Sequence, residues 1–189
     1  MRQISCMNRR KLLLSLGATS LAFPGCLGKQ TLNGTDDESS SDPNNTSKSM
    51  CDDLNRLQIT CEGPENSAFD LSIPRSPSSI GEELQVQMTN STEKTKYSGN
   101  RFKYDIQKKT DQRWQSIFWV HARPAWSDEA VEHKPGAGFT WEFEFTQGGL
   151  SRQNDTNPDY YVCNSLSEGR YRFVYFGYDT RCIAAEFMI

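Results

Sequence analysis

The chain has 189 residues, of which 24% are charged and 11% aromatic, and its formal net charge is −3. This length predicts one folded domain with extensions, and so many aromatic residues argue against a wholly disordered chain. Residues 1–25 hold four of the 21 basic residues and no acidic residue, so 17 basic residues face 24 acidic ones in the rest, a net charge of −7. Nucleic-acid binding needs a basic face, so this balance argues against a nucleic-acid partner.

The N-terminal segment has the organisation of an export signal. Residues 8–14 read Asn-Arg-Arg-Lys-Leu-Leu-Leu and open an apolar stretch that ends at Phe23. Basic residues followed by a short apolar stretch are typical of a signal peptide, and the stretch is too short to span a bilayer. The pair Arg9 and Arg10 resembles a twin-arginine signal. Residues 1–25 are therefore predicted to direct export and to be removed.

Cys26 follows Gly25 at the end of the apolar stretch, which resembles a prokaryotic lipobox. A lipid on Cys26 would anchor the exported chain to the outer face of the cell membrane, weakly through one acyl chain and firmly through two. Residues 26–56 are otherwise rich in Ser, Asp, Asn and Thr and show no apolar period. Such a composition predicts a disordered polar linker. The lipid on Cys26 makes the membrane one predicted partner of the chain.

Five asparagines lie in Asn-x-Ser/Thr triplets, the acceptor sequence for N-glycosylation. On an exported chain each is a candidate for glycan attachment. They are Asn33, Asn44, Asn45, Asn90 and Asn154.

From residue 57 onward apolar and polar residues alternate as they do in half-buried β-strands. The alternating stretches are separated by turn residues, and none has a helical period. They lie at 57–59, 69–73, 84–88, 102–106, 114–120, 139–145, 171–175 and 183–189. Seven or eight short strands of this kind predict an all-β fold, an antiparallel β-sandwich over residues 57–189.

Two segments carry a family resemblance. Residues 134–143 read Lys-Pro-Gly-Ala-Gly-Phe-Thr-Trp-Glu-Phe, and residues 166–175 read Leu-Ser-Glu-Gly-Arg-Tyr-Arg-Phe-Val-Tyr. They resemble the end of immunoglobulin-like domains on bacterial and archaeal surface lipoproteins, although Glu168 stands where that family usually has proline. With the signal and Cys26, the chain resembles haloarchaeal surface lipoproteins. The resemblance covers about residues 67–189 and implies an immunoglobulin-like sandwich, but no activity and no cofactor.

Four cysteines lie beyond the signal and Cys26, namely Cys51, Cys61, Cys163 and Cys182. An even number in an exported chain predicts two disulfides, and the lack of a Cys-x-x-Cys pair argues against a zinc or redox site. The immunoglobulin-like topology implied by the resemblance places the first strand near the start of the last one. It therefore favours a bridge from Cys51 or Cys61 to Cys182. The local pairing of Cys51 with Cys61 and of Cys163 with Cys182 stays open.

Few residues suggest chemistry. Ser127, Asp128 and His133 are the residue types of a hydrolase triad and lie close together in sequence. No nucleophile-elbow pattern accompanies them. The 155–159 stretch has oxygen ligands at alternate positions but lacks the glycine and distal glutamate of an EF-hand. We interpret these as loop residues and predict no catalytic residue, metal or cofactor. The same holds for the remaining set that could bind a metal: His121, Glu129, Glu132 and His133.

Aromatic residues outside the inward-facing strand positions are the candidates for binding. Exposed rings can stack on sugars or fill a partner's pockets, and the alternative is that they cover the ends of the sheets as part of the core. The candidates are Trp119, Trp126, Tyr160, Tyr161 and Tyr178.

The sequence thus predicts a non-enzymatic, lipid-anchored cell-surface domain that binds a protein or a glycan. One alternative is a structural envelope lipoprotein with no specific ligand. Another is a secreted protease-inhibitor-like module with an ordered protruding loop within 121–138 or 147–165. A hydrolase ranks last.

Overall fold

The computed structural model describes residues 49–62, 67–178 and 181–189, without the side chain of Arg181. The signal, Cys26 and the sequons at Asn33, Asn44 and Asn45 lie outside the described residues. No helix in the described ranges has the length and apolar composition that crossing a membrane requires.

The described part of the chain is nearly all β, as predicted. A 3-10 helix at Met50–Asp53 precedes the strands, and a four-residue helix, α1 (Gln147–Leu150), interrupts them. The strands are β1 (Asn55–Arg56), β2 (Phe69–Arg75), β3 (Glu83–Asn90), β4 (Lys96–Ser98), β5 (Tyr104–Lys109), β6 (Trp114–Ser116), β7 (Trp119–Val120), β8 (Val131–His133), β9 (Gly138–Glu144), β10 (Arg170–Tyr178) and β11 (Arg181–Met188).

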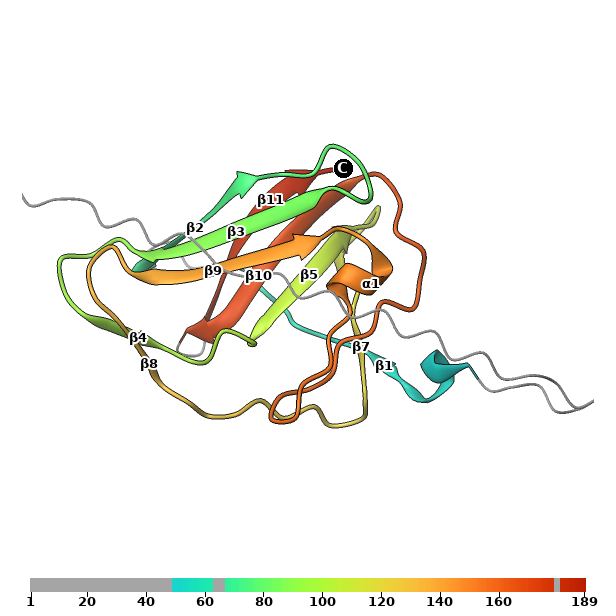
Figure 1. Ribbon diagram of the computed structural model, residues 1–189, viewed down its shortest axis with the longest axis horizontal. Helices are drawn as coiled ribbons and strands as arrows, with labels where there is room; N and C mark the ends of the chain where they lie inside the picture. The colour runs from blue at the N-terminus through green and yellow to red at the C-terminus, as the bar shows by residue number, and fades with distance from the viewer. Residues whose placement is uncertain (1–48, 63–66, 179–180) are drawn as a thin grey trace, which may run out of the picture. The chain divides into compact units, whose positions relative to one another are not determined.

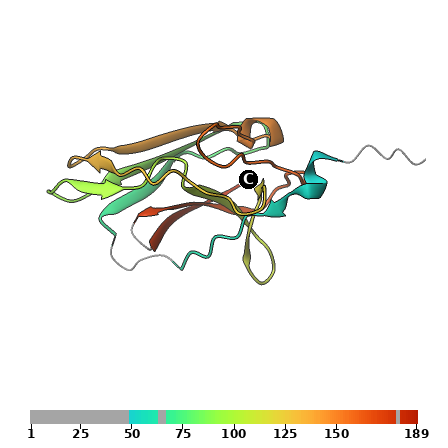
Figure 2. The same cartoon turned by 90° about the horizontal axis from the view of Figure 1, so that it is seen from below.

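Two larger antiparallel sheets form a sandwich. One has the strand order β11-β10-β5-β6 and the other β2-β3-β9. Figure 2 shows these sheets as two layers. Two short pairs complete the described fold: β4 with β8, and β1 with β7, which lie toward different ends of the sandwich (Figure 1).

The core between the sheets is aromatic because alternating strand positions point into it. Trp141 of β9 lies 4.9 Å from Phe173 and 5.7 Å from Tyr175 of β10, measured between ring centroids. Phe145, just after β9, meets Tyr171 edge-on. Such offset and edge-on contacts add to the stabilisation from burial, so the β9–β10 contact joins the two layers.

The N-terminal segment is built differently from the prediction. The linker was expected to run to residue 56, but residues 50–56 form the 3-10 helix and β1, and Leu54 is buried. Residues 57–62 form no strand, although their apolar residues alternate. The segment instead crosses the outer face of the four-stranded sheet, where the Ile59 carbonyl accepts a hydrogen bond from Gln107 Nε2 (2.7 Å). The alternation therefore reflects burial against a sheet face.

The predicted strand at 114–120 is two strands. The Phe118 N–H donates to Ser116 Oγ (3.0 Å), a local side-chain bond that competes with strand pairing. The chain leaves β5 at this point, and β7 pairs with β1, which places Trp119 opposite Arg56. The pairs β1–β7 and β4–β8 and helix α1 were not predicted.

Both disulfides are long-range. Cys51 is bonded to Cys163 and Cys61 to Cys182, with Cα atoms 5.9 and 5.6 Å apart. The favoured bridge from the N-terminal segment to the last strand is therefore present, and the local pairing is not. Cys61 and Cys182 pack with Val174 on the outer face of the four-stranded sheet. This bridge fixes the N-terminal segment on that face.

Candidate functional site

An exposed arch, residues 121–125, leaves the sandwich directly after β7. Its first residue is positioned by Trp119, whose N–H and C=O both bond to Tyr161 (2.8 and 3.0 Å). His121, Ala122, Arg123 and Ala125 are exposed. Arg123 has a φ of 59°, the left-handed conformation that non-glycine residues seldom adopt, so the arch turns sharply at its centre.

The arch is anchored again where it ends. The Trp126 indole N–H donates to the Tyr160 hydroxyl (3.0 Å), and the ring lies edge-on to Phe176. The next residue, Ser127, donates its N–H to Asn157 Oδ1 (3.2 Å) and accepts two hydrogen bonds from Asn100 Nδ2 (both 2.7 Å). Anchors at both ends make the arch an ordered loop despite its exposure.

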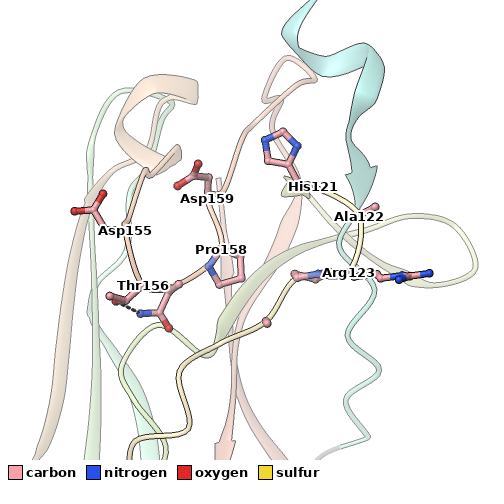
Figure 3. A pocket seen from close by; sticks show the side chains of 10 residues that line it. His121, Ala122, Arg123, Asp155, Thr156, Pro158 and Asp159 are labelled. Carbon is pink, nitrogen blue, oxygen red and sulfur yellow. Dashed lines mark hydrogen bonds between the residues drawn. The ribbon is translucent and has the colours of Figure 1, made fainter.

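A pocket of about 310 Å³ lies between the arch and residues 155–159. Figure 3 shows His121 on one wall and Asp159 and Pro158 on the other. Arg123 extends away from both carboxylates of the opposite wall (Figure 3). The pocket therefore offers an imidazole, a pyrrolidine ring and two aspartates, but no aligned pair of opposite charges.

Two further hollows surround the same loops. One, of about 440 Å³, lies on the other side of the arch, against residues 55–59. The other, of about 470 Å³ and lined mostly by apolar surface, lies between Met50 and residues 160–162. Met50 is 68% exposed, which is unusual for a large apolar side chain. The arch is thus a ridge with a hollow on each side.

Of the five aromatic candidates, Tyr160 cannot present its ring to a partner, because the ring is fully buried and stacks on Phe118. Its hydroxyl donates to the carbonyls of Phe102 and Tyr104, and burial raises its pKa. The guanidinium of Arg152 lies over the same ring, 4.5 Å from the centroid. Tyr160 is therefore a core residue of this end of the sandwich.

The other four candidates are half-buried rather than exposed. Tyr178 meets Phe69 edge-on at 5.1 Å, and Tyr161 meets His121 edge-on at 5.9 Å. The Trp119 ring, a candidate for binding, is covered by the guanidinium of Arg56, 4.8 Å away. The aromatic candidates therefore cover the ends of the sheets and form no open stacking surface.

The hydrolase residues do not meet. His133 is buried between Phe69 and Phe139, and its Nε2 lies 2.8 Å from Ser98 Oγ, whereas the hydrogen bonds of Ser127 go to Asn100 and Asn157. Burial lowers the pKa of His133. Ser127 is engaged by Asn100, and the fully exposed Asp128 forms an ion pair with Lys103 (3.6 Å).

The buried Ser98–His133 pair carries no catalytic geometry. The Ser98 hydroxyl also binds Tyr175 and the Gly99 carbonyl, so its hydrogen bonds are internal. This network joins β4 and β8 to β10.

Side-chain oxygen atoms of the 155–159 stretch accept hydrogen bonds from other groups of the chain. Asn157 Oδ1 accepts from Asn100 and Ser127, and Asp159 accepts from the Asn154 N–H and the Tyr161 hydroxyl. The stretch is therefore a hydrogen-bonded loop. Among the described residues, no group of three or more His, Cys, Asp or Glu side chains is placed to hold a metal.

The Asn90 side chain is buried and hydrogen-bonded within the folded domain, which argues against a glycan at this sequon. Asn90 is 1% exposed, and its amide nitrogen donates to the carbonyls of Lys94 and His133 (2.8 and 2.9 Å). Asn154 is half-buried, and its side-chain oxygen accepts from Thr156 and Asn157. A glycan would be attached to the side-chain amide nitrogen of Asn154.

A buried carboxyl group lies beneath the N-terminal segment. Asp105 accepts hydrogen bonds from Ser116 Oγ (2.5 Å) and Gln107 Nε2 (2.7 Å) and has no exposed surface. Burial raises its pKa from 3.8 to about 7, although both hydrogen bonds act in the opposite direction. Gln107 in turn accepts from Arg172 (2.6 Å). The polar chain from Arg172 to Asp105 was not predicted.

The arch lies within the 121–138 segment predicted as one of two possible protruding loops, but within that segment only Pro124 indicates a turn at this position. Comparison of the chain with protein-family models and with curated proteins gives no match.

Proposed function

We propose that the chain is an exported, lipid-anchored, non-enzymatic domain that binds a protein at the cell surface through the arch at residues 121–125. The observation that carries this proposal is the arch itself, which is exposed, anchored at both ends and flanked by two hollows. An ordered ridge loses little conformational entropy on binding, and adjacent hollows can receive a partner's side chains.

The placement outside the cell rests on the basic and apolar N-terminal sequence, on Cys26 and on the two disulfides. Disulfides persist in oxidising compartments. The order of the strands supports an immunoglobulin-like sandwich, because β10 pairs with both β11 and β5 in one sheet while β3 pairs with β9 in the facing sheet. Loops at the ends of such sandwiches are a frequent place for recognition.

A protein partner fits the site better than a glycan. Sugar binding commonly uses an open aromatic face, but Tyr160 is buried, and Trp126 and Tyr161 are half-buried and in contact with other rings. The separation of Ser127 from His133 supports a binding role over hydrolysis. The ordered arch is also the protruding loop expected of a protease inhibitor, so one class of partner is a protease.

Site-specific photo-crosslinking tests the proposal in cells. A benzoylphenylalanine at Ala122 or Ala125 should give a protein adduct, whereas the same probe at Gln87, on the outer face of β3, should not. Replacing Arg123 with Ala should weaken the adduct, because this exposed cation lies at the centre of the arch. Adducts of equal strength at Gln87, or adducts that a glycosidase removes, would argue against a protein partner at this site.

Intact mass tests the anchor separately. The protein purified from its membrane should begin at Cys26 with added lipid mass, and four thiols should appear only on reduction. A mass that retains residues 1–25 would contradict the export prediction without bearing on the arch. A panel of proteases assayed with the purified chain then distinguishes inhibition from simple binding.

A further inference from the structure

A fourth hollow, of about 260 Å³, lies over the four-stranded sheet where the N-terminal segment crosses it. Residues 56–60 form one wall and residues 113–116 the other, with Gln107 below. It shares no lining residue with the pocket of Figure 3. Most of its exposed lining is polar, so its chemistry differs from that of the hollow beside Met50.

Positive charge collects around this hollow, here named the arginine pocket. Arg56 and Arg113 line it, and Trp114, in the wall formed by residues 113–116, has the ammonium of Lys109 and the guanidinium of Arg172 over its ring at 5.1 and 4.6 Å. Within the described ranges, no carboxylate lies within 4.0 Å of any of these four cations. Other basic residues of the same ranges do form such ion pairs, namely Arg75, Lys103 and Arg170.

The carboxyl group beneath the pocket does not offset this charge at mildly acidic pH. Asp105 is buried, and its pKa of about 7 leaves it largely protonated below that pH. Burial and then the neighbouring Arg113 lower the pKa of Arg56, while the charge of Asp105, where it is ionised, acts in the opposite direction. A chain whose net charge outside residues 1–25 is −7 has thus placed unpaired cations in one pocket.

We propose that the arginine pocket binds the oxyanion of a small polar ligand, a carboxylate, sulfate or phosphate group. Guanidinium groups bind such oxyanions through charge-assisted, often bidentate hydrogen bonds. Arg56 already donates one N–H to the Ser116 carbonyl (2.6 Å), which fixes its position, while Arg113 is exposed. The side chains of Gln58, Thr60 and Gln115 could bond the hydroxyl groups of a sugar that carries the oxyanion.

NMR titration of the exported chain with sodium sulfate, glucuronate and glucose tests the proposal. We expect saturable shifts of the Trp114 indole N–H with both anions and none with glucose. Arg113→Gln should weaken binding about tenfold, the effect of losing one charge-assisted hydrogen bond. Arg75→Gln, an exposed arginine on β2, is the matched control and should leave the affinity unchanged.

Comparing the affinities for glucuronate and sulfate also indicates whether the oxyanion belongs to a sugar or to a free inorganic ion. Tighter binding of glucuronate than of sulfate would identify an acidic sugar, and equal binding would identify a free inorganic anion. The proposal is overturned if neither anion gives a saturable shift, if Arg113→Gln binds as tightly as the parent protein, or if glucose binds as well as glucuronate. Arg113 lies outside the arch and lines neither of the hollows beside it, so the result for Arg113→Gln does not bear on the protein partner.

Discussion

Replacing Asp105 with Asn should stabilise the protein at pH 8 and have little effect near pH 4. The folded-state pKa of Asp105 is about 7 and its ordinary value is 3.8, because burial penalises the charged form. The folded protein therefore holds a proton that the unfolded chain releases between pH 3.8 and 7. The contribution of the protonated Asp105 to the free energy of unfolding is fully present below pH 3.8 and is lost as the pH rises through 7.

The magnitude follows from the same difference. About 3 pH units at 1.36 kcal/mol per unit correspond to about 4 kcal/mol of stability lost by the parent protein across this range. Asn can accept from Gln107 through its oxygen and donate to the Ser116 hydroxyl through its nitrogen, so both hydrogen bonds of Asp105 have a counterpart. The variant should therefore escape this loss.

Urea unfolding of the oxidised protein between pH 4.5 and 8 measures the effect. The difference in unfolding free energy between Asp105→Asn and the parent should grow by about 1.4 kcal/mol per pH unit up to pH 6.5. Asp70→Asn, at an exposed position on β2, is the control and should give no such slope. A difference that stays constant with pH would refute the reasoning, because it would mean that Arg172 and the hydrogen bonds keep Asp105 ionised.

Three other predictions concern stability and modification. Replacing Cys61 and Cys182 together with Ser opens one bridge while the Cys51–Cys163 bond remains, so the loop released has about 30 residues and the cost in denaturant unfolding should be about 3–4 kcal/mol; a loss below about 1 kcal/mol would contradict the described pairing. Gly138→Ala places a Cβ 1.7 Å from the Met88 carbonyl oxygen and should lower stability by about 3 kcal/mol or more, whereas Gly148→Ala, with nothing within 4 Å, should stay within about 0.5 kcal/mol in the same thermal-unfolding assay. Asn90→Ala should cost about 2 kcal/mol by leaving two carbonyls without their donor, and peptide mapping should find Asn90 without a glycan.

The strands of the two larger sheets could be predicted because burial of every second residue produces an alternation of apolar and polar residues within a single short segment. In β10, for example, Tyr171, Phe173 and Tyr175 are fully buried while Arg172 between them is not. The β4–β8 pair could not be predicted in this way, since it is three residues long and joins Lys96 to His133 through the fold. Alternation also misled at residues 57–59, because a segment that crosses a sheet face buries alternate residues without pairing.

The candidate sites depended even more on long-range contacts. The identity of Tyr160 gives no indication that Phe118 and Arg152 enclose its ring. Arg56 and Arg113 are far apart in sequence and share a pocket only because β1 pairs with β7 and β6 lies beside β5. The disulfide partners were a special case, because four cysteines allow only three pairings and the topology implied by the resemblance favoured the two in which Cys51 or Cys61 is bonded to Cys182.

The order of the bridged cysteines along the chain has a consequence for proteolysis. Cys51 and Cys61 both precede Cys163 and Cys182, and each of the first two is bonded to one of the last two. A single backbone cut anywhere between residues 61 and 163 therefore leaves two fragments held together by two covalent bonds. That interval includes the exposed arch at residues 121–125, so a protease that cleaves the arch would release no fragment until the disulfides are reduced.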